Sequence, residues 1–480
     1  MNDINNPLQS AIAALEPDVT ERMKLTRAVI SYAEEFLQNI RHLPAFIPSE
    51  AKGAGLHDSP IGEDPIGIDE ALRLLKTNVD VPGLNPASGG HLGYIPGGGL
   101  YHGALGDFLA SVTNRYAGVF FASPGAVRME NMLLGWMAAI IGYPGTSGGT
   151  LTSGGSLANL IGVVTARDEH DLKGRDLERS VIYLTDQTHH SIDKAIRIAG
   201  LKECLVRRIP LDNSYRMIPE ELNRSIIADR AAGLNPWLVI ASAGTTDVGA
   251  VDPLPEIGSL AKQHGLWFHL DAAYGGFFVL CESGKRVLQG METSDSIVMD
   301  PHKGLFIPYG SGAVLVKDKQ KLLASHHYQA NYMQDALSST DELSPADLSP
   351  ELSKHFRGLR LWLPLKLAGV QAFRVVLEEK IQLARHFYES VKTFDGIEVG
   401  PAPGLSIVTF RYVPASGDAD DFNRRLVQEI QNDGRVFLSS TVLDNRVTLR
   451  FAVLSFRTHV DTVDRALEIL REKITLVQKG

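Results

Sequence analysis

The sequence is poor in cysteine and in clustered positive charge. Only two cysteines, Cys204 and Cys281, occur in 480 residues, and they form no Cys-x-x-Cys pair. This excludes a disulfide framework and favours a reducing compartment. The 47 basic residues are outnumbered by 56 acidic ones, for a net charge of −9. Because nucleic-acid binding depends on gathered Lys and Arg, we expect no nucleic-acid partner.

Long hydrophobic runs are also missing. The most apolar window, MLLGWMAAIIGY (132–143), falls well short of the roughly 20 residues that a membrane helix needs. The first residues, MNDINNPLQSAIAALEPD, contain no basic segment followed by an apolar core, so no signal peptide is visible. We therefore expect a soluble, cytoplasmic protein without a membrane partner.

Short apolar runs alternate with helical segments between residues 150 and 318. The runs are apolar on both faces, as strands of a buried parallel sheet are. They are VIYLTD (181–186), CLVRRIP (204–210), WLVIASAG (237–244), LWFHLDAA (266–273), SIVMDP (296–301) and GAVLVKD (312–318). The pattern predicts an α/β fold with a mainly parallel sheet, whose ligands bind beyond the carboxyl ends of the strands.

The flanking regions have helical periodicity. Apolar spacing predicts helices over 20–40 and 68–79, and a long helical pattern extends to about residue 141. The sequence from about 395 onward is typical of a small α/β unit. We expect an N-terminal helical segment, a large domain and a small C-terminal α/β domain, at 1–85, 86–365 and 366–480.

A glycine- and serine-rich segment, TSGGSLANL (152–160), opens one predicted helix. Backbone N–H groups and hydroxyls at a helix start suit a phosphate. Ser156 would also cap the helix without any ligand, so both interpretations stay open. No Gly-Lys-Ser/Thr follows, which excludes a Walker A loop.

Two ionisable side chains follow neighbouring predicted strands. Asp271, in HLDAAYGG (269–276), ends a strongly apolar strand, where a carboxylate needs a cation or hydrogen-bond donor. It is either part of a structural ion pair or the partner of a protonated ring nitrogen. Lys303, in DPHKG (300–304), is either a solvated surface lysine or a partly desolvated amine suited to a Schiff base.

Adjacent histidines occur in DQTHHSIDKA (186–195). Neighbouring side chains face different directions, so at most one of His189 and His190 reaches the sheet edge. No further His, Cys or Glu spacing completes a ligand set, and we expect no metal site. The histidine is either structural or stacked on a planar cofactor.

The combination is more specific than its parts. A phosphate cradle, an aspartate and a lysine, one after each of several strands, are what pyridoxal 5'-phosphate (PLP) needs. The phosphate anchors this cofactor, the lysine bonds its aldehyde, and the aspartate keeps its ring nitrogen protonated.

Five segments together resemble the group II PLP-dependent amino acid decarboxylases, a family best known from aromatic-L-amino-acid decarboxylase. They are TSGGSLANL, DQTHHSIDKA, SAGTTDVGAVDP, HLDAAYGG and DSIVMDPHKGLF. The resemblance spans roughly residues 20 to 370. It implies a PLP-dependent transferase fold of type I, with a seven-stranded sheet. It also implies a homodimer with its active site at the interface and the N-terminal helices wrapped around the partner.

The resemblance implies roles for residues around the cofactor ring. Lys303 would form the Schiff base, and Asp271 would pair with the pyridine nitrogen. His189 would stack on one face of the ring and Ala273 would lie against the other.

Further residues would contact the phosphate and the substrate. Gly155 and Ser156 would bind the phosphate, with help from Asp300 or its backbone. Thr246 and His302 would lie near the cofactor and the substrate carboxylate.

Two segments beyond the predicted sheet also match the family. Tyr332 corresponds to the mobile-loop tyrosine that returns a proton to the substrate carbon. Phe356-Arg357 corresponds to an arginine-containing segment beyond that loop.

The sequence departs from the family at several positions. Leu157 stands where glutamate is common, Gly304 where a bulky aromatic residue usually follows the lysine, and Asp300 where asparagine is frequent. HLGYIPGGG (91–99) lacks the aromatic-rich run often seen there. These changes leave the cofactor contacts in place but alter the substrate side.

The activity implied is decarboxylation of an L-amino acid to its amine and CO2 through a quinonoid intermediate. An aromatic substrate is favoured, with glutamate, diaminobutyrate and histidine open. Alternatives on the same fold are a carbon–carbon lyase of the sphingosine-phosphate-lyase kind and an aldehyde synthase. A catalytically silent binding protein is disfavoured by the presence of Lys303, Asp271 and His189.

Overall fold

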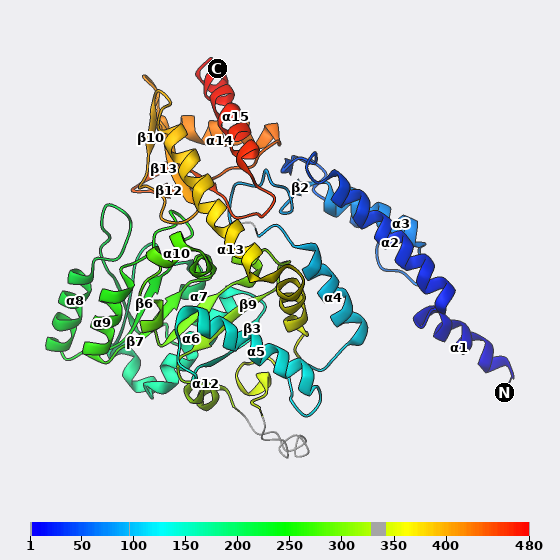
Figure 1. Ribbon diagram of the computed structural model, residues 1–480, viewed down its shortest axis with the longest axis horizontal. Coiled ribbons are helices and arrows are strands. Elements are labelled where there is room, and N and C mark those ends of the chain that lie inside the picture. Colours follow the sequence, from blue (N-terminus) through cyan, green and yellow to red (C-terminus); the bar gives the residue numbers. More distant parts are fainter. Residues whose placement is uncertain (1, 96, 328–341, 480) are drawn as a thin grey trace.

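The computed structural model describes residues 2–95, 97–327 and 342–479. It consists of a large sheet-containing body, a small C-terminal sheet unit beside it, and N-terminal helices that extend away from the body (Figure 1). This arrangement confirms the predicted α/β class, the small C-terminal α/β unit and the N-terminal helical segment.

The large body is built on a seven-stranded sheet in the order β3-β9-β8-β7-β6-β4-β5. The strands are β3 (Gly148–Thr152), β4 (Ser180–Leu184), β5 (Leu205–Arg208), β6 (Asn235–Ser242), β7 (Trp267–Asp271), β8 (Ser296–Met299) and β9 (Gly312–Val316). Strands β5, β4, β6, β7 and β8 pair in parallel, and β9 runs antiparallel to both of its neighbours. All six predicted strands are present, and the mainly parallel sheet is confirmed.

Helices cover both faces of this sheet. Alternate residues of one strand enter different cores: Tyr183 of β4 joins one apolar cluster and Ile182 joins another. The first cluster includes side chains of α5 (Pro124–Ile141), α8 (Pro219–Ala231) and α9 (Leu254–His264). The second includes side chains of α6 (Gly155–Glu169), α7 (His190–Ile198) and α12 (Lys319–His326). Short helices α10 (Glu282–Val287) and α11 (Pro301–Gly304) complete this body. Burial on both faces explains why the strands are apolar throughout.

The long helical pattern up to residue 141 is wrong as a single element. It forms two helices, α4 (Tyr101–Thr113) and α5. Asn114 ends α4 in the left-handed conformation, with φ of 44°, and Pro124 begins α5. Asn tolerates this conformation and proline suits a first helical turn, so local chemistry separates the helices.

The small C-terminal unit is an antiparallel sheet in the order β10-β11-β13-β12. Its strands are β10 (Ile397–Val399), β11 (Ile407–Tyr412), β12 (Ser439–Leu443) and β13 (Arg446–Ala452), packed with α14 (Ala419–Asp433) and α15 (Val460–Lys479). Helix α13 (Arg357–Val391) reaches from the large body into this unit and is interrupted at Gly369, where φ is 71°. The domain boundaries at 85/86 and 365/366 stay predictions.

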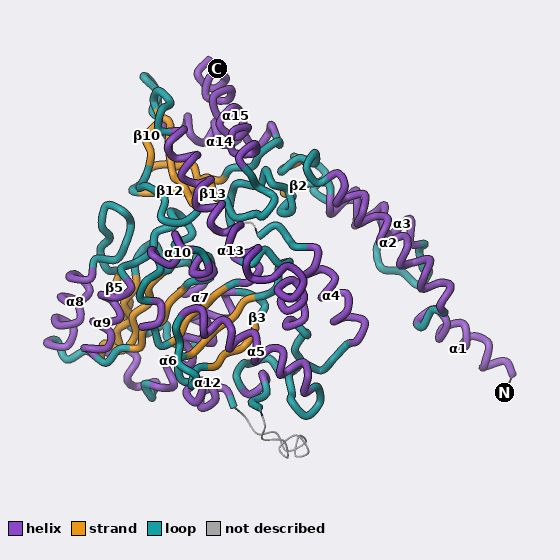
Figure 2. Tube along the Cα trace, in the orientation of Figure 1, coloured by secondary structure: helices purple, strands orange, loops and turns teal. Residues whose placement is uncertain are grey.

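The N-terminal helices are α1 (Asn2–Leu15), α2 (Val19–Asn39) and α3 (Ile68–Leu75), and a short π-helical segment (76–80) follows α3. Figure 2 shows these helices projecting from the rest of the chain. A two-stranded ribbon of β1 (Phe46–Ile47) and β2 (Gly83–Leu84) lies between them and the body. The helices predicted over 20–40 and 68–79 are confirmed, but α2 buries none of its residues in this chain.

Candidate active site

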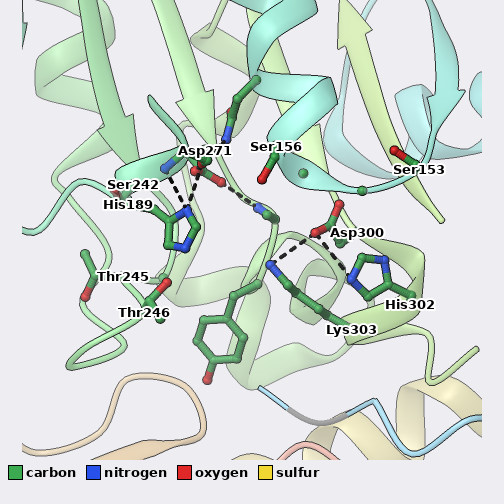
Figure 3. Close-up of a pocket in the computed structure, with 17 residues that line it drawn as sticks. Ser153, Ser156, His189, Ser242, Thr245, Thr246, Asp271, Asp300, His302 and Lys303 are labelled. Atoms are coloured by element: carbon green, nitrogen blue, oxygen red, sulfur yellow. Dashed lines mark hydrogen bonds and ion pairs between the residues drawn. The ribbon is translucent and has the colours of Figure 1, made fainter. Parts of the chain in front are cut away.

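A cavity of about 280 Å³ lies beyond the carboxyl ends of the central strands. All nine predicted cofactor contacts line it: Gly155, Ser156, His189, Thr246, Asp271, Ala273, Asp300, His302 and Lys303. Figure 3 shows His189 and Asp271 on one side of this space and Lys303, Asp300 and His302 on the other. The cavity is therefore where the parallel-sheet topology places a ligand site.

One wall of the cavity is the N-terminus of α6. The amides of its first turn have no carbonyl partner within the helix, because helical bonding begins where Ala158 N–H donates to the Gly154 carbonyl. A Cβ at position 155 would lie 2.9 Å from Asp300 Oδ2 and 3.2 Å from Ala273 Cβ. Only glycine leaves this space open, and the free amides suit an anion such as phosphate.

Lys303 lies on α11, the short helix that follows β8. Its Nζ is 3.1 Å from Asp300 Oδ2, and the Asp300 side chain is only 1% exposed. The other carboxylate oxygen, Asp300 Oδ1, is buried without a hydrogen-bond partner in the described residues. The lysine amine thus faces the cavity, held by a single carboxylate oxygen.

His302 lies next to this pair. Its Nδ1 donates to the carbonyl oxygen of Ser311, and its Nε2 is 3.8 Å from Asp300 Oδ2. Burial lowers the pKa of His302 below its usual range, against the opposing effect of the Asp300 carboxylate. The imidazole is therefore neutral near pH 7, with its proton on Nδ1 and an unprotonated Nε2.

The opposite wall carries Asp271 and His189. Asp271 ends β7; its Oδ1 accepts the Ala273 N–H at 3.1 Å and its Oδ2 accepts a proton of the Asn159 amide at 3.0 Å. His189 precedes α7, and its Nδ1 accepts the Ser191 N–H at 3.2 Å. Burial lowers the pKa of His189, while nearby Asp271 acts to raise it. A neutral ring therefore lies beside a hydrogen-bonded carboxylate.

The small C-terminal unit supports the loop that carries Thr246. Arg450 of β13 is only 3% exposed, and its guanidinium donates to the Thr246 carbonyl. It also donates to the Asp247 carbonyl at 2.9 Å and to Ser439 Oγ at 2.9 Å. A buried arginine therefore connects the four-stranded sheet to a loop that lines the cavity.

Several lining residues were not singled out from the sequence. They are Ser153, Gly154, Asn159, Ser191, Ser242, Gly244, Thr245 and Tyr274. Asn159 could have been found, because it lies four residues after Gly155 and therefore on the same face of α6. Ser191 could have been found as the residue two positions after His189.

The remaining predicted residues are Tyr332 and Arg357. Tyr332 falls outside the described residues. Arg357 does not line the cavity; its guanidinium binds both carboxylate oxygens of Glu351, at 2.8 and 2.9 Å.

The residues that line the cavity fit PLP. A free helix N-terminus with an obligatory glycine suits the phosphate, and a cavity-facing lysine suits the aldehyde. A buried carboxylate with hydrogen-bond donors on both oxygens suits the protonated ring nitrogen, and His189 and Ala273 suit its faces.

Comparisons with known proteins give the same assignment. The model of the pyridoxal-dependent decarboxylase conserved domain matches residues 88–413. The aromatic-L-amino-acid decarboxylase of Bacillus atrophaeus is 36% identical over 427 residues, which cover 87% of this chain and 86% of that protein. A phenylacetaldehyde synthase of Petunia hybrida is 30% identical, covering 94% of this chain and 93% of that protein.

A solved structure supports the fold. The crystal structure of Oryza sativa TDC with PLP and tryptamine superposes with a TM-score of 0.90 at 28% identity, covering 96% of this chain and 99% of that one. This agreement confirms the predicted type I fold. The family match spans more than half of the chain and includes every cavity residue named above. The chain belongs to the pyridoxal-dependent decarboxylase family, and it is a carboxy-lyase that uses PLP to decarboxylate an amino acid.

Proposed function

We propose that this enzyme converts an aromatic L-amino acid to the corresponding amine and CO2. The observation that carries the proposal is the meeting of Lys303, Asp271 and His189 in one cavity. Support for an aromatic substrate comes from the Bacillus atrophaeus relative, whose name specifies aromatic amino acids and whose similarity covers 87% of this chain.

Each cavity residue has a proposed task. PLP, when bound, supplies an electron-withdrawing ring that weakens the bond to the departing carboxylate. Lys303 would provide the amine that bonds the cofactor aldehyde and that the substrate amine would replace. The amides of Gly155 and Ser156 would hold the phosphate, and the Asp271 carboxylate would accept a hydrogen bond from the protonated ring nitrogen.

The remaining groups orient the reactants. His189 and Ala273 would flank the two faces of the ring, and Thr246 and His302 would contact the substrate carboxylate. Asp300 aligns the Lys303 amine through their 3.1 Å contact. The proton that replaces the carboxylate comes from Tyr332, a role that rests on the sequence match alone.

We also propose that the active enzyme is a homodimer with its active site at the interface. The exposed apolar surface of the N-terminal helices supports this. Leu15 is 86% exposed, Val19 66% and Ile30 53%. Apolar side chains in such number need a covering surface. Light scattering coupled to size-exclusion chromatography should give twice the mass of one chain.

A cytoplasmic location is part of the proposal. Both cysteines are unpaired and buried, as in a protein from a reducing compartment. No helix in the described part of the chain is long and apolar enough to cross a membrane.

Product analysis tests the proposed reaction. Purified enzyme with added PLP should release CO2 and one equivalent of amine from tryptophan, tyrosine or phenylalanine, and much less from glutamate. The Petunia hybrida relative makes an aldehyde synthase the main rival. Aldehyde and peroxide in place of amine would assign that reaction instead, and turnover of glutamate alone would overturn the aromatic substrate.

A further inference from the structure

A line of buried hydrogen bonds runs from the interior of the large body to Asp271. Trp267 Nε1 lies 2.8 Å from Ser296 Oγ, which lies 2.7 Å from His269 Nδ1. His269 Nε2 is 3.0 Å from Asn159 Oδ1, and Asn159 Nδ2 is 3.0 Å from Asp271 Oδ2. Every side chain in this line is less than 9% exposed.

The carboxylate end determines the direction of every bond. An ionised carboxylate can only accept, so the Asn159 amide nitrogen donates to Asp271 and the Asn159 carbonyl faces His269 Nε2. His269 therefore carries its proton on Nε2, and its Nδ1 accepts the proton of Ser296 Oγ. An indole N–H can only donate, so Ser296 Oγ accepts from Trp267, which agrees with this order.

A branch of the same line reaches His189. The second Nδ2 proton of Asn159 is directed at Ser191 Oγ, 3.1 Å away. The Ser191 N–H donates to His189 Nδ1 at 3.2 Å, so this nitrogen is an acceptor and also takes the proton of Ser191 Oγ, 2.7 Å away. Two donors on Nδ1 leave the His189 proton on Nε2.

The fold makes room for the central imidazole. Gly162 lies inside α6, where glycine costs about 1 kcal/mol relative to alanine. A Cβ at this position would lie 2.5 Å from His269 Cε1 and 2.8 Å from its Nδ1. Burial also lowers the pKa of His269 to about 4, so its ring is neutral at pH 7.

We propose that Trp267, Ser296, His269 and Asn159 form a one-directional relay that sets the proton positions at both walls of the cofactor site. The relay supplies Asp271 Oδ2 with a hydrogen-bond donor, and it holds His189 in the Nε2–H tautomer. These four are positioning residues, since they act through Asp271 and His189. The inference deepens the proposed function, because it rests on Asp271 as the partner of the ring nitrogen.

Neutron diffraction from a deuterium-exchanged crystal of the holoenzyme tests the relay without any substitution. We expect deuterium on Nε2 and none on Nδ1 in both His269 and His189, with the Asn159 amide nitrogen facing Asp271. Deuterium on Nδ1 of either ring would overturn the proposal. The same map shows separately whether Asp271 faces the ring nitrogen, so failure of that assignment is distinguishable from failure of the relay.

Two substitutions at one position give a second test. His269→Gln keeps an amide N–H near the position of Nε2–H, whereas His269→Leu removes it. Loss of a buried donor to this network should weaken binding of PLP to the apo-protein roughly tenfold or more in His269→Leu. His269→Gln should stay within about threefold of wild type. Absorbance titration of the folded variants with PLP measures both dissociation constants.

Thr165→Val is the matched control. Thr165 is fully buried on α6, the helix that carries Asn159. Its hydroxyl donates to the Ile161 carbonyl and contacts Ser325 Oγ, both outside the relay. Its PLP affinity should equal that of wild type. Wild-type affinity in His269→Leu, or equal losses in His269→Leu and His269→Gln, would contradict the relay.

Discussion

Lys303 and Lys354 each pair with a buried carboxylate, yet their surroundings differ. The Lys354 side chain is fully buried; its Nζ bonds Glu130 Oε1 at 2.5 Å and Thr150 Oγ1 at 2.7 Å. Glu130 Oε1 also accepts the Leu151 N–H at 2.9 Å. The Lys303 side chain is 24% exposed, and within the described residues its Nζ has one partner, Asp300 Oδ2.

The comparison separates a structural lysine from a reactive one. Lys354 Nζ has two hydrogen-bond partners, joins β3 and α5 to the segment before α13, and is fully buried. Burial lowers the pKa of Lys354, but the Glu130 carboxylate opposes this and keeps the pair together. Lys303 has unused hydrogen-bonding capacity directed at the cofactor cavity. Amine N–H groups that lack hydrogen-bond partners and face a cavity therefore identify the reactive lysine better than burial does.

Lys303→Ala should show the largest effect on activity. Removal of the amine that holds the cofactor should lower kcat/KM on the order of a thousandfold or more, while the protein stays folded. Amine release from an aromatic amino acid measures the loss, and circular dichroism checks the fold. A variant with activity within tenfold of wild type would remove Lys303 from the proposed role.

Lys354→Met should lower the stability of the protein and leave its activity nearly unchanged. Glu130 would be left buried without its cation, at a cost of about 3–5 kcal/mol in the free energy of unfolding. Urea unfolding measures this cost, and kcat per folded molecule should stay within about twofold of wild type. The double variant Lys354→Met/Glu130→Leu should recover part of the stability. A stable but inactive Lys354→Met would contradict the distinction between the two lysines.

Asp271→Asn should impair chemistry without unfolding the protein. The amide keeps the shape of the side chain but loses the charge that stabilises the protonated ring, so kcat should fall roughly a hundredfold. Steady-state kinetics and the PLP content of the purified variant separate catalysis from cofactor loss. Full turnover by Asp271→Asn would show that the carboxylate has a structural role only.

His91 extends the comparison to a buried group that is kept neutral. It is 1% exposed, and burial lowers its pKa to about 4, against about 6.5 in the unfolded chain. Between pH 6.5 and pH 4, His91 is therefore protonated in the unfolded chain but neutral in the folded protein. Stability present above pH 6.5 should be lost in this window, by about 2 kcal/mol between pH 7 and pH 5.

His91→Gln isolates this contribution. The variant cannot titrate at position 91, so its loss of stability between pH 7 and pH 5 should be smaller than that of wild type by about 2 kcal/mol. Urea unfolding at both pH values provides the comparison. Equal pH dependence in the two proteins would show that His91 titrates normally.

Site residues could be predicted from the sequence where a local pattern determines their position. Asp271 and Lys303 follow apolar strands, and parallel topology brings the ends of such strands together, so their meeting was predictable. Gly155 and Ser156 were predictable from the chemistry of a helix start. The edge strand β3 was not singled out, because GGTLT has two glycines and little apolar character.

The remaining features depend on contacts between distant segments. Lys354 and Glu130 are 224 residues apart, and Arg450 is 204 residues from Thr246. No periodicity encodes such pairs; they follow from how the elements pack. The direction of the relay behind Asp271 likewise needed the positions of five side chains, which come from the three elements β7, β8 and α6.

Identification of the lysine that bonds the cofactor tests the central claim most directly. The holoenzyme is reduced with borohydride, digested, and its pyridoxyl-labelled peptides are located by mass spectrometry. We predict a single label, on Lys303. A label on another lysine, or no label in an enzyme that still releases amine from its substrate, would contradict the account.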